Sequence, residues 1–282
     1  MKVLPFQIPK PENDALVLQE DIEFAFYNKL HQHEEIQISL IVKGEGTLIV
    51  GDTINNFKAG NILVLGSNLP HVFQSSENLK EKSHMITLFF TKDSFGNDFF
   101  DLQELNEING FFKQAKHGFK IVADKSILKL FLEMKTASKL ERFISLLQLL
   151  KKTVSLEYES LSSFIYEKKY SAVEGKRMQD VFEFTMNNYT KEISLNNVAN
   201  IASMTKNAFC KYFKKRTNKS YFQFLNELRI ENASKLIVSN TDFTLAEIAY
   251  KSGFNNISNF NRQFKSIKKM SPSTFKKIKN NS

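Results

Sequence analysis

The segment GFNNISNFNRQFK, residues 253 to 265, places three Phe among four Asn, one Arg and one Lys. Phe260 and Phe264 are four residues apart, so both lie on one face of a helix. Asn is disfavoured inside helices, because its side chain competes for backbone hydrogen bonds. The spacing therefore predicts a helix with a buried aromatic face, and the amide-rich opposite face requires a functional explanation.

The same pattern occurs earlier in the chain. LNNVANIASMTKNAFCKYFKK (195–215) aligns with LAEIAYKSGFNNISNFNRQFKS (245–266) when one residue is skipped at the turn. The alignment pairs apolar residues: Leu195 with Leu245, Val198 with Ile248, Ala199 with Ala249, Phe209 with Phe260, and Phe213 with Phe264. Residues that favour helix N-termini precede the expected helices: Ser194, Thr205, and Asn256 or Ser258. We therefore expect two helix-turn-helix units, connected by a long helix over 220–239.

Positive charge is concentrated in the same part of the chain. Residues 174–282 hold 19 Lys and Arg against 8 Asp and Glu, a net charge of +11, whereas residues 1–173 hold 20 against 22, a net charge of −2. This asymmetry favours a polyanionic partner for the C-terminal part. Charge alone would equally fit a basic domain with no partner. The two aligned units with interleaved aromatic residues favour double-stranded DNA.

Two sets of side chains are the candidate DNA contacts. A helix in the major groove packs one side on its own unit and turns the other toward base edges, where Asn can pair with adenine and Arg with guanine. The outward positions are Lys206, Asn207, Cys210, Lys211 and Lys214 in the first unit, and Asn256, Ser258, Asn261, Arg262 and Lys265 in the second. Phosphate contacts are expected from Lys214, Lys215, Arg216, Lys268 and Lys269. No nearby His activates Cys210, so we expect a groove-facing residue there rather than a nucleophile.

Three motifs resemble the DNA-binding domain of AraC-type transcription regulators, the arabinose-regulator family. They are IAYKSGF (248–254), SNFNRQFK (258–265) and MSPSTFKK (270–277). The resemblance covers the C-terminal hundred residues and is more specific in the second unit than in the first. The family often has Gly before its Ser-Pro pair, where this chain has Met270. The resemblance implies two helix-turn-helix units on one connecting helix, which contact successive major grooves.

The N-terminal part is typical of a strand-rich domain followed by helices. IQISLIV, TLIV, NILVL and HMITLFF alternate and predict short strands, and KGEG (43–46) and VGDT (50–53) predict turns. Such a series favours a sandwich or barrel. From Asp98 the pattern becomes helical, with an apolar stripe over 126–152. The fold class is therefore α+β. We expect one domain over 1–170 (barrel about 20–92, helices about 98–168) and an all-α domain over 175–282, with the boundary in KKYSAVEG (168–175).

A second candidate site lies in HQHEEIQ (31–37) and LPH (69–71). On an expected strand, His31 and His33 point to the same face, and His71 could join them. Imidazoles with an oxygen donor suit a transition metal. The spacing is similar to that of the cupin barrel, although that family's usual Glu falls at Gln37, a poorer metal ligand. Three interpretations stay open: a metal centre at His31, His33 and His71, an effector pocket formed by these residues with Gln37, and purely structural histidines.

Composition and length bound the remaining possibilities. With 282 residues, 42% of them apolar, the chain can form two packed domains. A single cysteine excludes an internal disulfide framework and a cysteine-based zinc site. We expect no transmembrane helix, no signal peptide and no membrane partner. A cytoplasmic location is the simplest interpretation.

These observations predict a sequence-specific DNA-binding transcription regulator controlled by a small-molecule effector. The resemblance implies that the cupin-like domain senses the effector without performing catalysis, so neither an enzyme nor a cofactor is expected. A homodimer and contact with RNA polymerase are further expected partners. The helical stretch 126–152 is the expected dimer element, and simple core packing of the same stretch is the open alternative. The alternatives are a metal-dependent cupin enzyme with a basic helical appendage, and an architectural protein that binds DNA without sequence preference.

Overall fold

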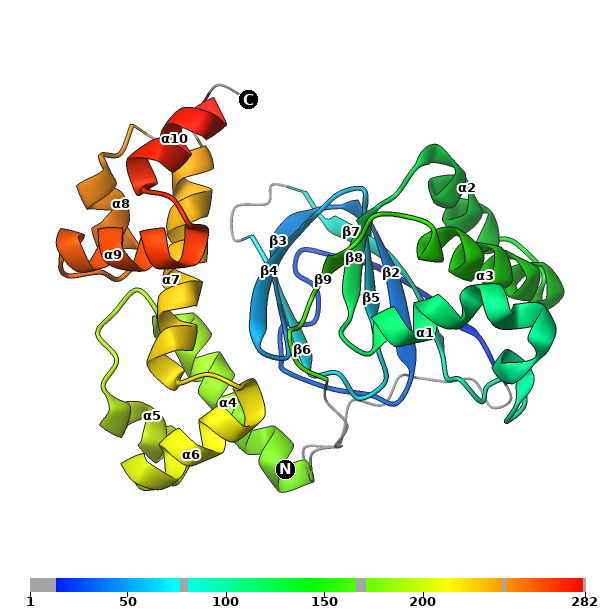
Figure 1. Ribbon diagram of the computed structural model, residues 1–282, viewed down its shortest axis with the longest axis horizontal. Coiled ribbons are helices and arrows are strands. Elements are labelled where there is room, and N and C mark those ends of the chain that lie inside the picture. Colours follow the sequence, from blue (N-terminus) through cyan, green and yellow to red (C-terminus); the bar gives the residue numbers. More distant parts are fainter. Residues whose placement is uncertain (1–13, 77–80, 166–170, 240–241, 281–282) are drawn as a thin grey trace. The chain divides into compact units, whose positions relative to one another are not determined.

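The computed structural model describes residues 14–76, 81–165, 171–239 and 242–280 (Figure 1). The chain forms two compact units that divide between Lys176 and Arg177. The first unit combines strands with helices and the second is helical, so the predicted α+β class is confirmed. The boundary expected over 168–175 falls partly on residues 166–170, which lie outside the described residues.

Two antiparallel sheets form the centre of the first unit. The strands are β1 (Val17–Glu23), β2 (Ile36–Lys43), β3 (Glu45–Val50), β4 (Thr53–Lys58), β5 (Asn61–Leu65), β6 (His71–Ser75), β7 (Ser83–Phe90), β8 (Phe119–Val122) and β9 (Glu159–Ser160). Among the described residues, the larger sheet has the order β1-β7-β2-β5-β8-β9 and the smaller sheet the order β4-β3-β6.

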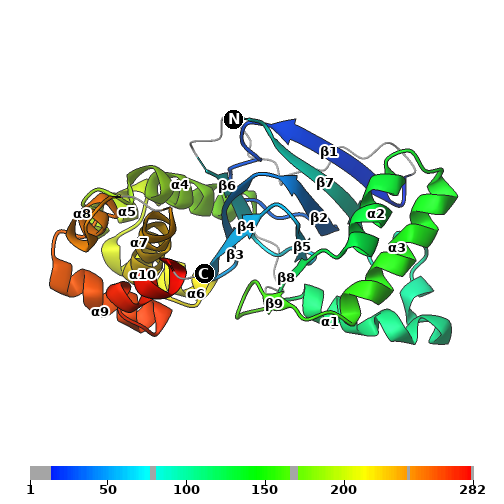
Figure 2. The same cartoon turned by 90° about the horizontal axis from the view of Figure 1, so that it is seen from above.

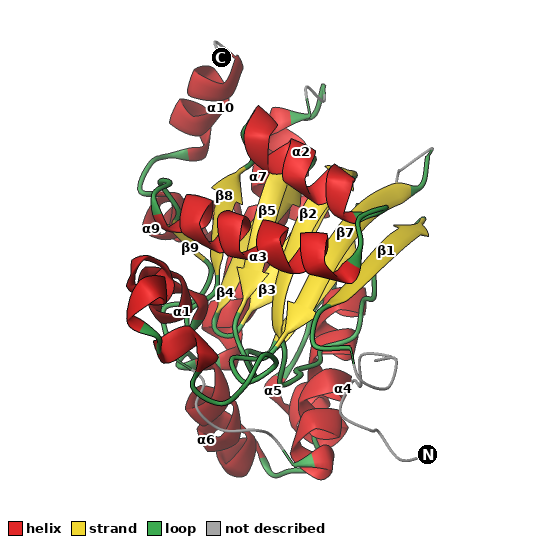
Figure 3. Cartoon of the chain, turned by 90° about the vertical axis from the view of Figure 1, so that its right-hand side faces the viewer, coloured by secondary structure: helices red, strands yellow, loops and turns green. Residues whose placement is uncertain are grey.

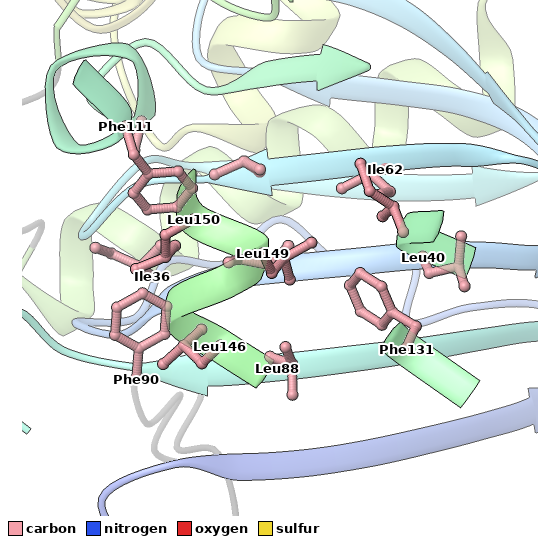
Figure 4. Close-up of a cluster of buried hydrophobic side chains, with 14 of the residues drawn as sticks. Ile36, Leu40, Ile62, Leu88, Phe90, Phe111, Phe131, Leu146, Leu149 and Leu150 are labelled. Carbon is pink, nitrogen blue, oxygen red and sulfur yellow. The ribbon is translucent and has the colours of Figure 1, made fainter. Parts of the chain in front are cut away.

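Helices cover one face of the larger sheet, and the smaller sheet covers the other (Figures 2 and 3). The helices are the 3-10 helices η1 (Phe99–Asp101) and η2 (Gln103–Ile108), and α1 (Asn109–Ala115), α2 (Lys125–Met134) and α3 (Lys139–Val154). Figure 4 shows Leu146, Leu149 and Leu150 of α3 packed over the side chains of Ile36 and Phe90. This apolar packing holds α3 on the sheet.

A second apolar core lies between the two sheets. Leu48 of β3 and Phe57 of β4 meet Leu63 of β5 and Met85 of β7 there. Leu161, which directly follows β9, is fully buried in the same core. Because both faces of β5 are covered, its sequence NILVL is buried along its whole length, as is usual for a doubly covered strand.

The segment expected to be helical from Asp98 onward also contributes strands. β8 pairs with β5 and β9 pairs with β8, so the larger sheet extends beyond the expected 20–92. The apolar stripe over 126–152 is divided between α2 and α3. The division occurs at Ser138, which forms a capping box with Glu141 at the start of α3.

The second unit consists of helices that share one connecting helix. They are α4 (Ala172–Asn188), α5 (Leu195–Ile201), α6 (Lys206–Thr217), α7 (Tyr221–Val238), α8 (Leu245–Lys251), α9 (Ile257–Lys268) and α10 (Pro272–Asn280). The first half of α7 packs on α6, with the Phe224 and Phe213 rings 5.9 Å apart. The second half packs on α8 and α9, through Ile230 and Ile237. No helix in the described ranges is both long and apolar enough to cross a membrane.

Candidate functional site

The two helix-turn-helix units have equivalent hydrogen bonds at their turns. In the first unit, the amide of Met204 donates to the carbonyl of Ala199 at 2.9 Å. In the second, the amide of Phe254 donates to the carbonyl of Ala249 at 3.0 Å. The residue skipped in the sequence alignment is therefore Asn255, which follows this turn. The internal repeat inferred from the sequence is a repeat of backbone structure.

The residue before each of these amides has a left-handed backbone conformation. Ser203 has a φ of 53° and Gly253 a φ of 90°. At Gly253 a Cβ atom would lie 2.5 Å from the carbonyl oxygen of Tyr189 and 2.8 Å from Nε of Arg229. Arg229 of α7 donates from Nε to that same carbonyl at 2.7 Å. The second turn is thus packed against the segment that follows α4, and glycine is required there.

The exposed faces of α6 and α9 carry the residues predicted from the sequence. Thr205 caps α6 and Asn256 caps α9, as expected. Phe209 and Phe260 are fully buried, which fixes the opposite faces toward solvent. The exposed set is Lys206, Asn207, Cys210, Lys211 and Lys214 around α6, and Asn256, Ser258, Asn261, Arg262 and Lys265 around α9.

Two of these side chains have partners that bear on their role. The Asn256 side chain accepts hydrogen bonds from the amides of Ser258 and Asn259, at 2.7 and 3.2 Å. Its carbonyl oxygen is therefore engaged in capping α9 rather than directed outward. Arg262 donates to the side chain of Asn259 at 2.9 Å, one turn earlier on the helix. That bond orients the guanidinium along the exposed face.

The expected phosphate contacts divide into two groups. Lys214, Lys215 and Lys269 are exposed. Lys268 instead forms an ion pair with Glu231 of α7, and Arg216 stacks over the Tyr212 ring at 4.0 Å. These two side chains stabilise the fold of the unit, so the exposed lysines are better candidates for phosphates.

In the N-terminal compact unit, Met1–Lys176, three histidines form a cluster. The Nδ1 or Nε2 atoms that His31, His33 and His71 offer lie within 4.8 Å of one another. His31 is bridged to His71 by reciprocal backbone hydrogen bonds, and His33 lies in the loop before β2. The expectation that His31 and His33 share a regular strand is therefore wrong, yet the cluster forms because the bridge brings β6 beside this loop.

All three imidazoles have the same hydrogen-bonding arrangement. Nδ1 of each lies 2.8 to 2.9 Å from a backbone carbonyl: that of Lys29 for His31, of Glu35 for His33 and of Leu69 for His71. Nδ1 therefore carries the proton in each ring, and Nε2 carries the lone pair. Among the described residues, nothing hydrogen-bonds Nε2 of His71, although that side chain is fully buried.

A chain of polar side chains continues from the cluster into the larger sheet. Oε1 of Gln37 lies 3.1 Å from Nε2 of His33, and Nε2 of Gln37 donates to Oγ of Ser39 at 2.8 Å. Ser39 in turn lies 2.9 Å from the hydroxyl of Thr87. A neutral His33 ring that donates from Nδ1 accepts at Nε2, and Gln37 would then have to turn its NH₂ group toward the ring, the reverse of the amide orientation in the structure.

Burial keeps these imidazoles neutral. Desolvation lowers the pKa of His31 to about 3, and it lowers the pKa of His33 and, more strongly, that of His71. The neutral rings can act as hydrogen-bond acceptors or as ligands of a metal ion.

A small cavity of about 80 Å³ adjoins the cluster. His31 and Gln37 line it together with aromatic side chains such as Phe73 and Phe89. Asp21 and Glu23 of β1 also line it. Burial raises the pKa of Asp21. The cavity thus combines acidic and aromatic groups with the imidazole of His31 and the amide of Gln37.

Asp52 holds the segment around Ser162 and Ser163, by which the chain leaves the N-terminal compact unit. The sequence indicated Asp52 only as part of a turn. Oδ1 of Asp52 accepts from the Ser162 hydroxyl at 2.9 Å and from the Ser163 amide at 3.0 Å, and Oδ2 accepts from the Ser163 hydroxyl. Thr53 and Asn55 donate to the carbonyl of Leu161. The pairing spans distant parts of the chain, so no local pattern could have identified it.

Two family models match the chain. One, described as the AraC-like ligand binding domain, matches residues 17–89, and the other, described as a helix-turn-helix domain, matches residues 198–278. The first contains the histidine cluster and the second contains both α6 and α9.

Similar proteins extend over most of the chain. It is 23% identical over 265 residues to an uncharacterized HTH-type transcriptional regulator, YdeC, of Bacillus subtilis (strain 168), covering 89% of this chain and 87% of that protein. It is 21% identical to the HTH-type transcriptional activator RhaS of Enterobacter sp. (strain 638), covering 83% of this chain and 82% of the relative. The crystal structure of ToxT from Vibrio cholerae O395 is similar with a TM-score of 0.38 at 15% identity, covering 95% and 99% of the two chains.

Proposed function

Because this chain belongs to the AraC-type family of helix-turn-helix transcription regulators, we propose that it binds a specific DNA sequence under the control of a small-molecule effector. The observation that carries the proposal is the repeated unit: α6 and α9 each bury an aromatic face and expose a polar, basic one. The net charge of +11 over 174–282 supports a polyanionic partner.

On α9, Asn261 and Arg262 are the proposed base-contacting residues. Both are exposed, and Arg262 donates a hydrogen bond to the Asn259 side chain. On α6, Lys206, Asn207 and Lys211 occupy the corresponding exposed face, with Cys210 as a small residue between them. Lys214, Lys215 and Lys269 would neutralise phosphates and position the unit without specifying sequence.

The histidine cluster, with Gln37, is the proposed effector site. Nε2 of His71 is buried without a hydrogen bond among the described residues, and His31 and Gln37 line the adjoining cavity. Such polar groups are suited to recognising a ligand, because an unsatisfied buried acceptor is unfavourable until it is bound. A metal-dependent enzyme is the alternative at these residues. The relatives that cover most of the chain are described as transcription regulators, which favours sensing over catalysis.

A homodimer through the surface of α3 is part of the proposal. Leu140 and Ile144 of α3 and Leu132 of α2 are between 47% and 67% exposed, so they offer an apolar surface outside the core. Contact with RNA polymerase and a cytoplasmic location complete the proposed setting. Sedimentation of residues 1–168 would show a monomer at high concentration if α3 forms no interface.

Selection of bound sequences from random duplex DNA tests the function. The full chain is used at near-physiological salt, because non-specific affinity varies steeply with salt. We expect a motif whose two parts lie about one helical turn apart, one part for each unit. Equal retention of all sequences would instead support an architectural DNA-binding protein and contradict the proposal.

A further inference from the structure

We infer that the effector is a small ammonium compound, whose positively charged head occupies the cavity beside the histidine cluster. The inference rests on the proposed function, since it names the chemical class that the proposed effector site binds. The cavity of about 80 Å³ is lined by residues of β1, β2, β6 and β7 and by the segment that leads from β1 to His31. Its charge, its aromatic rings and its opening each bear on the ligand.

β1 supplies the negative charge of the cavity. Asp21 and Glu23 lie two residues apart on this strand, so they face the same side of the larger sheet, and both line the cavity. The described residues of the lining include no Lys or Arg, and burial lowers the pKa of His31 to about 3, which keeps its imidazole neutral. The cavity would therefore repel a carboxylate or phosphate ligand and attract a cation.

Neither carboxylate forms an ion pair within the described part of the chain. Gln19 donates from Nε2 to Oδ1 of Asp21 at 2.8 Å, which orients this carboxylate without neutralising it. Lys135 pairs instead with Glu20, which points to the opposite face of β1. Burial raises the pKa of Asp21 and the charge of Glu23 raises it further, although the bond from Gln19 opposes this. A cationic ligand would supply the missing compensation.

Aromatic rings form the inner part of the cavity. Phe26, Phe73 and Phe89 are buried, and all three line it. The Phe26 and Phe73 rings lie 6.1 Å apart, edge to face. Ring faces attract ammonium groups, and apolar walls favour the alkyl part of an organic cation over a hydrated metal ion. The lining thus suits a ligand that is both charged and partly apolar.

The opening and the volume of the cavity limit the size of the ligand. Glu23, Ala25 and Tyr27 line it and are exposed, which places them at its rim. Among the described residues, β1 is an edge strand of the larger sheet, so no further strand lies beyond this rim (Figure 2). At about 10–15 Å³ for each water-sized group, the cavity holds roughly five to eight non-hydrogen atoms. An alkylammonium ion such as n-butylammonium fits this volume.

The aromatic wall connects the cavity with the segment by which the chain leaves this unit. Phe26 and Phe73 belong to the same buried core as Leu161. Leu161 directly precedes Ser162, whose hydroxyl donates to Asp52. A ligand packed against the two rings would therefore act on the core that holds this segment, which gives the cavity a route to the DNA-binding unit.

The experiment measures binding of n-butylammonium to the full chain by calorimetry, at neutral pH and constant ionic strength. Two comparison ligands have a similar shape: n-butanol carries no charge and butyrate carries the opposite charge. We expect one equivalent of n-butylammonium to bind, at least about 10-fold more tightly than either comparison ligand. Equal affinities for n-butylammonium and n-butanol would overturn the inference.

Two variants test whether the position of the charge matters. Asp21→Asn removes the charge and retains the shape, so it should weaken n-butylammonium binding by at least about 10-fold. Glu20→Gln is the matched control, because it removes one charge from the neighbouring residue on the other face of β1, and it should bind normally. Equal binding by the two variants would overturn the inference.

A stability measurement separates loss of the ligand site from misfolding. Asp21→Asn should unfold at a urea concentration no lower than that of the native protein, because it removes a partly buried charge that lacks a counter-ion. A lower midpoint would show that the charge of Asp21 is already compensated within the protein and would overturn the inference.

The last measurement connects the cavity with DNA binding. The affinity for the selected DNA is measured with n-butylammonium chloride and with sodium chloride at equal ionic strength, and it should differ by at least about 5-fold. An unchanged affinity would overturn the assignment of this ligand class as the effector. A motif recovered from DNA selection would in that case leave the proposed function standing.

Discussion

Ser203 and Gly253 occupy equivalent positions in the two helix-turn-helix units, and both have a positive φ, of 53° and 90°. Their surroundings differ. At Gly253 an added Cβ would collide with the backbone oxygen of Tyr189, whereas Ser203 accommodates a side chain, which is exposed. The turn of the second helix-turn-helix unit is thus packed directly against the segment after α4.

Gly253→Ala should therefore be strongly destabilising. A positive φ and a 2.5 Å contact with a backbone atom predict a loss of about 2–3 kcal/mol in the free energy of unfolding. Urea unfolding measures this. Gly175→Ala is the control, because no atom lies within 4 Å of its Cβ position in α4, and it should stabilise by about 0.5–1 kcal/mol. Equal effects of the two substitutions would contradict this account of the turn.

Asn256 allows the capping role to be separated from a DNA-contacting role. Asn256→Ala removes the acceptor for the amides of Ser258 and Asn259 and should cost about 1 kcal/mol of stability. Asn256→Asp retains the cap, so stability should be preserved. Thermal unfolding and DNA binding are measured together. Loss of sequence preference in the stable Asp variant would show that the Nδ2 group contacts a base.

Arg262 and Lys269 are predicted to contribute to DNA binding in different ways. Arg262→Ala should relax specificity at one base pair by about 1–3 kcal/mol, whereas Lys269→Ala should weaken all sequences similarly and reduce the salt slope by about one. Binding is measured on the selected site and on single-base variants at several salt concentrations. Lys268 is unsuitable for this comparison, because its pairing with Glu231 makes its removal a change in stability. Indistinguishable profiles for the two variants would contradict the proposed division.

Asp52→Ala should loosen the segment around Ser162 and Ser163, by which the chain leaves the N-terminal compact unit. The substitution removes an acceptor for the Ser162 and Ser163 groups and should destabilise this unit by about 2–3 kcal/mol. Asp98→Ala is the control, because Asp98 is exposed and its side chain makes no capping hydrogen bond. Proteolysis near residue 165 should accelerate in Asp52→Ala alone. An unchanged cleavage rate would show that other contacts hold this segment.

Glu20 predicts a pH dependence of stability. The hydrogen bond from Lys135 lowers the pKa of Glu20 most strongly, and His84 lowers it further. Because the folded-state pKa is depressed, the contribution is present above the unfolded pKa near 4.5 and is lost as pH falls through the folded-state pKa. Glu20→Gln should therefore be less stable than the native protein at pH 6 and equally stable below the folded-state pKa. Urea unfolding across this range measures it, and a constant difference would contradict the assignment.

The sequence predicted the helix-turn-helix units well because their information is local. The spacing of Phe260 and Phe264, the caps at Thr205 and Asn256, and the residue skipped at the turn all reappear in the structure. Each depends on neighbours within one or two helical turns. Helical periodicity and capping chemistry are sufficient to locate such elements.

The features that the sequence did not predict depend on distant contacts. β8 has only four residues, and its pairing with β5 decides its conformation. The cluster of His31 with His71 results from a bridge between separate segments, not from a shared strand. The sequence placed Lys268 among the phosphate contacts, whereas the structure pairs it with Glu231. Hydrophobic periodicity carries no information about which distant residues pair.

The connecting helix α7 has a consequence for the DNA sites that we propose this protein binds. Its two halves belong to different hydrophobic cores, so a single continuous rod fixes the distance and rotation between α6 and α9. One base pair inserted between the two parts of a binding site would turn the second part by about 35° and displace it by about 3.4 Å. Sites with altered spacing would therefore be discriminated against even when every contacted base is correct. The spacing between the two parts of a site would thus be recognised together with their base sequence, because the length of α7 fixes the distance between α6 and α9.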